Sequence, residues 1–106
     1  MLASLQSCLR RDRVLYTQHA RREMREEPFG RIAENEVYEA LLDGEVIEDY
    51  PDDTPYASCL IFGRSRVGRP IHLVCAYAPE DDRVIIVTVY EPDPGRWIDL
   101  RRRVAP

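Results

Sequence analysis

Apolar residues follow a helical spacing in the first part of the chain. Leu2, Leu5 and Leu9 fall near one face of a short helix, for which Ser4 offers an N-cap. The run ends in a group of arginines. The pair Leu15-Tyr16 that follows is too short to carry a period, and we interpret it as a bend or a strand fragment.

Two further helices are predicted before residue 45. Thr17 is a suitable N-cap for a helix over residues 18–27, which Pro28 would stop. Another helix is expected over residues 34–43, with Gly44 in the left-handed conformation at its end. Apolar residues recur in it at helical spacing, at Val37, Ala40 and Leu41.

After Gly44 the pattern changes to the alternation and β-branched runs of strands. Strands are predicted over residues 46–50, 57–64, 70–78 and 84–90, separated by turns rich in Pro, Gly and Asp. Short connections favour antiparallel neighbours. We therefore predict one α+β domain over residues 1–106, in which N-terminal helices pack on a roughly four-stranded antiparallel sheet. Residues 99–106 form a tail that Trp97 is expected to hold down.

The second and third of these strands read as a hairpin centred on Val67. This symmetry places Cys59 opposite Cys75 and Arg64 opposite Pro70. One face of the hairpin is then apolar enough to be the core beneath the helices. The other face combines apolar and charged groups in the manner of a binding surface, with Leu60, Phe62, Arg64, His72 and Val74.

Composition and charge narrow the class of protein. The 106 residues are 44% hydrophobic and 32% charged, and no apolar run reaches the ~20 residues of a membrane span. The N-terminus lacks the basic start of a signal peptide, so we expect a cytoplasmic protein. All fifteen basic residues are arginine. Three arginine-rich blocks would suit either a phosphate site or a solvated surface, and residues 32–55 carry acids without a base.

The cysteines and histidines do not form a metal motif. Cys8, Cys59 and Cys75 lack a C-x-x-C spacing, and we expect them to be reduced, with the strand cysteines in the core. His72 and Cys75 point to opposite faces of a strand, and His19 with Glu23 lacks a third ligand. We therefore expect no metal and no cofactor.

His19 and His72 remain as candidates for proton transfer. His19 lies in the first turn of a helix, where an imidazole kept neutral could accept a proton at pH 7. The alternative is a histidine that caps the helix or lies at the edge of the core. For His72 the alternative is an ordinary strand histidine with its hydrogen bonds satisfied.

Several segments resemble the domain-of-unknown-function family 4258 over roughly residues 14–98. They are Tyr16-Thr17-x-His19-Ala20-Arg21-Arg22-Glu23-Met24, residues 44–53, residues 55–60, Gly68-Arg69-Pro70-Ile71-His72-Leu73-Val74 and Val87-Thr88-Val89-Tyr90-Glu91-Pro92-Asp93-Pro94. The family is similar to the RelE-like toxins, which have helices packed on an antiparallel sheet and often cleave messenger RNA, free or on the ribosome. The resemblance also implies a partner, a small antitoxin with C-x-x-C zinc motifs, as in MqsR-like pairs. Two departures lie beside His19, an insertion over residues 26–32 and Ala33 in place of a Ser or Thr cap.

The leading hypothesis is the toxin of a type II toxin–antitoxin pair that cleaves RNA without a metal. His19 or His72 would exchange the proton, Tyr90 would donate a proton or stack on a base, and Thr88 completes the motif. The arginines expected to bind the substrate are Arg22, Arg64 and Arg69. The alternative is a non-catalytic module of toxin-derived fold that docks a protein partner through its acidic 34–53 segment or its apolar sheet face.

Overall fold

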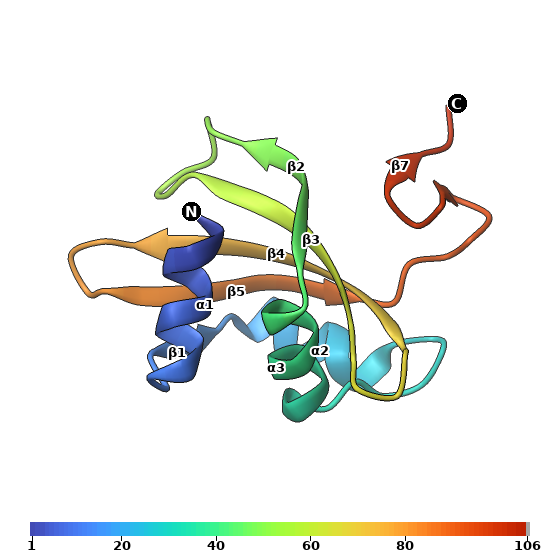
Figure 1. Cartoon of the computed structure of the whole chain (residues 1–106), viewed down its shortest axis with the longest axis horizontal. Coiled ribbons are helices and arrows are strands. Elements are labelled where there is room, and N and C mark those ends of the chain that lie inside the picture. Colours follow the sequence, from blue (N-terminus) through green and yellow to red (C-terminus); the bar gives the residue numbers. More distant parts are fainter. Residues whose placement is uncertain (106) are drawn as a thin grey trace.

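Three helices lie against one side of a five-stranded sheet in the computed structural model, which describes residues 1–105 (Figure 1). The strand order is β1-β5-β4-β3-β2. No helix within these residues is long and apolar enough to cross a membrane. The elements are α1 (Leu2–Arg10), β1 (Val14–Tyr16), α2 (Gln18–Glu26), α3 (Glu34–Leu42), β2 (Glu45–Tyr50), β3 (Ser58–Arg64), β4 (Pro70–Ala78), β5 (Arg83–Tyr90), β6 (Trp97–Ile98) and β7 (Arg102–Arg103).

The α+β class is confirmed, but the sheet is mixed rather than four-stranded and antiparallel. Residues Val14–Tyr16 form a fifth strand that pairs in parallel with β5, with Leu15 opposite Ile85. The backbone N–H of Thr17 extends this pairing by donating to the Ile86 carbonyl at 3.1 Å. Three residues are too few to show a period, so this strand is defined only by its distant partner.

The predicted hairpin register is confirmed. Cys59 lies opposite Cys75 and Arg64 opposite Pro70. The face that carries both cysteines packs beneath the helices, where each of the two is fully buried. Leu5, Leu41 and Ile86 are also fully buried in this core.

The helix ends follow the sequence signals in part. Thr17 caps α2 as predicted, since its hydroxyl accepts a hydrogen bond from the Ala20 N–H at 3.0 Å. Ser4 is not a cap, because α1 already begins at Leu2. Gly44 does not take the left-handed conformation; in residues 1–105 only Gly30 and Gly68 are glycines with positive φ. Its lack of a side chain instead leaves room for Ile61.

Helix α3 lies directly on β3 at Gly63. A Cβ at this position would stand 1.8 Å from the Ala40 carbonyl oxygen and 2.7 Å from its carbon. Only glycine therefore permits this contact between helix and sheet.

The second face of the sheet is covered around His72 and Phe62, which the sequence analysis expected to be exposed. After β5, a β6–β7 hairpin folds over this face, while the helices occupy the other (Figure 1). As a result His72 is fully buried, Phe62 is 4% exposed, and Trp97 of the hairpin is 6% exposed. The prediction that Trp97 holds the tail is thus confirmed, and it explains why this strand face is apolar.

Candidate functional site

A groove of about 970 Å³ runs along the second sheet face. Its floor contains Val74 of β4 with Thr88 and Tyr90 of β5. One wall is the α2–α3 loop, which contributes Phe29, and the other is the C-terminal segment, which contributes Arg96 and Trp97. The groove therefore combines aromatic rings and hydroxyl groups with two arginines and three acidic side chains.

A chain of hydrogen bonds leads from this groove into the protein. The Nε2 atom of His72 is 2.6 Å from the carbonyl oxygen of Leu100, and its Nδ1 atom is 3.1 Å from the Tyr90 hydroxyl. A carbonyl can only accept, so Nε2 carries the proton. In the neutral ring Nδ1 is then the acceptor, and the Tyr90 hydroxyl donates to it.

Burial keeps both members of this pair uncharged. Desolvation lowers the pKa of His72 below its ordinary value, and it raises the pKa of Tyr90 to about 12. The His72 ring is held edge-to-face by Trp97, with ring centroids 4.5 Å apart, and by Phe62 at 5.7 Å. Its position and tautomer are therefore fixed by packing as well as by hydrogen bonds.

Ion pairs hold the C-terminal wall of the groove. Arg103 donates to both carboxylate oxygens of Glu48 on β2, at 2.9 and 3.1 Å, and its guanidinium lies over the Trp97 ring. Arg101 pairs with Glu45 at 2.5 Å. These bonds fix the hairpin that presents the Leu100 carbonyl to His72.

His19 lies outside the groove. Its side chain is 57% exposed and pairs with Glu23 at 3.2 Å. The same Glu23 oxygen accepts the Val89 N–H at 3.0 Å, and burial raises the pKa of this carboxyl group. Within residues 1–105 no three His, Cys, Asp or Glu side chains gather as a metal site.

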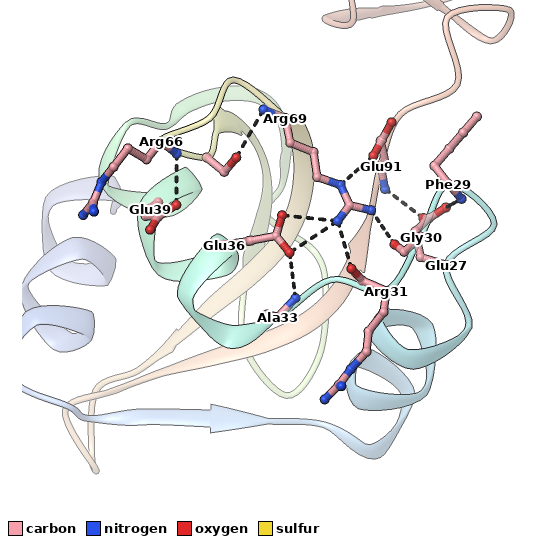
Figure 2. A network of polar contacts seen from close by, with 11 residues as sticks. Glu27, Phe29, Gly30, Arg31, Ala33, Glu36, Glu39, Arg66, Arg69 and Glu91 are labelled. Carbon is pink, nitrogen blue, oxygen red and sulfur yellow. Dashed lines mark hydrogen bonds and ion pairs between the residues drawn. The ribbon is translucent and has the colours of Figure 1, made fainter.

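Arg69 is the centre of a polar network rather than an open cation (Figure 2). Its guanidinium pairs with Glu91 at 2.6 Å and Glu36 at 3.2 Å, and it donates to the carbonyls of Gly30 and Arg31. The Arg69 side chain is only 17% exposed. Its charge is therefore used to join the α2–α3 loop, α3 and the end of β5.

The other two arginines proposed for the substrate are exposed but lie outside the groove. Arg22 is on α2, and Arg64 is at the end of β3, where it donates to the Gly68 carbonyl at 3.1 Å. The structure thus brings together His72, Thr88 and Tyr90, and it does not add His19 or these arginines.

Sequence reasoning missed the groove residues outside the sheet. These residues are Phe29, Arg96 and Trp97. The signals for them in the sequence are an aromatic residue in the inserted loop and the pair Arg96-Trp97 directly after Pro94-Gly95. In the acidic 34–53 segment, four of the nine acids form ion pairs within the chain, and docking of a partner through this segment stays a prediction. The four are Glu34, Glu36, Glu45 and Glu48.

The burial of neutral His72 predicts a pH-dependent stability. Because the folded-state pKa lies below the unfolded value near 6.5, the unfolded chain binds more protons between these two values. The stabilising contribution is complete above pH 6.5 and is lost as the pH falls. We expect urea unfolding between pH 5 and 7.5 to show a steeper acid loss for the wild type than for His72→Gln. Parallel curves for the two proteins would contradict this.

Fold and groove together define a small α+β protein with a tyrosine–histidine pair on the sheet face opposite its helices. The model of the family described as Domain of unknown function (DUF4258) matches residues 16–91, and the chain belongs to this family. The matched region includes His72 and Tyr90 but ends before the β6–β7 hairpin. No curated protein and no solved structure matches the chain.

Proposed function

We propose that this protein is the toxin of a type II toxin–antitoxin pair, related to the RelE-like and MqsR-like toxins, and that it cleaves RNA without a metal ion. The observation that carries the proposal is the hydrogen-bonded chain from the Leu100 carbonyl through His72 to Tyr90, which ends in a groove. A reactive hydroxyl backed by a base, itself oriented by a third group, is the arrangement that activates hydroxyls in enzymes.

In the proposed reaction, Tyr90 is the residue that meets the RNA. Its oxygen accepts the proton of the ribose 2′-hydroxyl while its own proton passes to Nδ1 of His72. The 2′-oxygen then bonds to phosphorus, and the bond from phosphorus to the 5′-oxygen breaks. The proton returns through Tyr90 to that 5′-oxygen, which leaves a 2′,3′-cyclic phosphate and a 5′-hydroxyl.

The partners in this proposal are messenger RNA, free or on the ribosome, and a small antitoxin with C-x-x-C zinc motifs. Support for the RNA comes from the aromatic and arginine side chains of the groove, since unpaired bases stack on aromatic rings. The antitoxin rests on the family resemblance. Induced expression without this antitoxin is expected to arrest growth.

Tyr90→Phe is the decisive variant for this mechanism. It keeps the ring and removes the hydroxyl, so cleavage of a synthetic unstructured RNA should fall on the order of a hundredfold. We expect His72→Gln to lose activity similarly, whereas His19→Gln should cleave like the wild type because His19 lies outside the groove. The rate is measured on denaturing gels in EDTA, and thermal unfolding confirms that each variant is folded.

Two results would overturn the proposal. One is Tyr90→Phe that is folded and cleaves as fast as the wild type. The other is a wild-type protein that neither cleaves RNA nor arrests growth, which would favour a binding module instead.

A further inference from the structure

Phe29 is a large apolar side chain left exposed at the edge of the groove. It is 54% exposed, and Figure 2 shows its ring extending away from the α2–α3 loop. Single exposed apolar residues are common on protein surfaces, so exposure by itself assigns no role. The structure around this residue gives the additional evidence.

One carboxylate ties the Phe29 backbone to the strand that carries Tyr90. Glu27 accepts the Phe29 N–H at 3.0 Å with one oxygen and the Glu91 N–H at 2.8 Å with the other. Glu91 directly follows Tyr90 in the chain. The backbone of Phe29 is therefore tied to the backbone of the residue that follows Tyr90.

The other side of the loop is held by Arg69. Its guanidinium donates to the carbonyl of Gly30, the residue after Phe29, and to the carbonyl of Arg31 at 2.9 Å. The loop thus presents an apolar ring on a backbone that is bonded both before and after it. Because this backbone is already fixed, less conformational entropy is lost when a ligand stacks on the ring that it carries.

Three acidic side chains line the groove, but each of them already has a partner within the protein, so they oppose an anionic ligand less than three free carboxylates would. Glu91 is paired with Arg69, Glu27 accepts two backbone N–H groups, and Asp93 accepts the Gly95 N–H at 2.8 Å. Arg96, by contrast, forms no ion pair with any residue of the described 1–105. The groove therefore has a cation available opposite an exposed aromatic ring.

We infer that Phe29 is a stacking platform for one unpaired base of a single-stranded RNA whose backbone phosphate reaches Arg96. This inference rests on the proposed function and adds its substrate class. A base within a duplex is already stacked on both sides, so the ring selects single strands. Every base has a face that can stack, so Phe29 supplies affinity with little sequence preference.

The test measures binding apart from cleavage. A short oligodeoxynucleotide lacks the 2′-hydroxyl and is not cleaved, and a 2-aminopurine base within it loses fluorescence when it stacks on an aromatic ring. We expect the wild type to quench this signal. Phe29→Ala should weaken binding about tenfold and abolish the quenching, whereas Phe29→Trp should retain both. Arg96→Gln should weaken binding and make it less dependent on salt.

Val67→Ala is the matched control, since Val67 is 88% exposed at the β3–β4 turn and does not line the groove. It should bind like the wild type. If the wild type cleaves RNA but Phe29→Ala binds the oligonucleotide with unchanged affinity and quenching, the inference fails and the proposed function stands. If a duplex binds as tightly as the single strand, the inference also fails. If the wild type neither binds nor cleaves, both fail together.

Discussion

Gly63→Ala is expected to destabilise the protein by about 3 kcal/mol or more, which is a large part of the stability of a small domain. The new Cβ would lie 1.8 Å from the Ala40 carbonyl oxygen and 2.7 Å from its carbon. Both atoms belong to the backbone of α3, so no side-chain rotation can relieve the overlap. The helix would have to move away from β3 and lose its packing on the core. Urea denaturation followed by circular dichroism measures the effect.

Two other glycines serve as controls for this prediction. At Gly44 a Cβ meets the Ile61 methyl at 2.5 Å, a side-chain atom that can move, so Gly44→Ala should cost less than Gly63→Ala. At Gly95 the nearest atom is the Asp93 carboxylate at 3.3 Å, and Gly95→Ala should change stability by less than about 0.5 kcal/mol. Equal losses at Gly63 and Gly95 would show that α3 is not in contact with β3 as described.

Arg69→Gln is expected to cost about 3 kcal/mol of unfolding free energy. The substitution leaves Glu36 and Glu91 without their cation, although both side chains are only about a fifth exposed. It also removes the donors to the Gly30 and Arg31 carbonyls. Arg69→Lys should recover only part of the loss, because one ammonium cannot reproduce the fork that serves four acceptors.

The neighbouring Arg66 provides the control. Only its backbone N–H takes part in the network, donating to Glu39 at 2.9 Å, and its side chain has no ion pair within residues 1–105. Arg66→Gln should therefore change stability by less than about 0.5 kcal/mol in the same urea titration. An Arg69→Gln protein as stable as Arg66→Gln would mean that the network contributes nothing to folding.

The local elements of this fold could be predicted from the sequence, because each has a signal within a few residues. The Thr17 cap and the symmetry of the hairpin about Val67 are two such signals. The parallel strand β1 could not, since its three residues pair with residues 84–86 and have no pattern of their own. Arg69 looked like a substrate-binding cation, because sequence does not reveal which carboxylates a cation will meet.

The candidate site could also be predicted only where a local pattern indicates it. The strand alternation placed His72 on the face that carries the groove, and the family motif added Thr88 and Tyr90. The β6–β7 hairpin buries His72, which the sequence analysis expected to be an exposed base. In the proposed mechanism His72 therefore acts through Tyr90. Nothing in the tail's own sequence specifies that the Leu100 carbonyl will meet the ring, because this contact spans 28 residues.

The pairing of β1 with β5 sets an order for the folding of the newly made chain. Strand β5 lies between β1 and β4, so the sheet stays incomplete until residues 83–90 have been synthesised. Until then the apolar faces of α1 and α2 lack the strand against which they pack. Such non-local closure is slow and leaves intermediates prone to aggregation. Ribosome-bound chains truncated before residue 83 should therefore be digested by protease much faster than chains that extend past the end of β5.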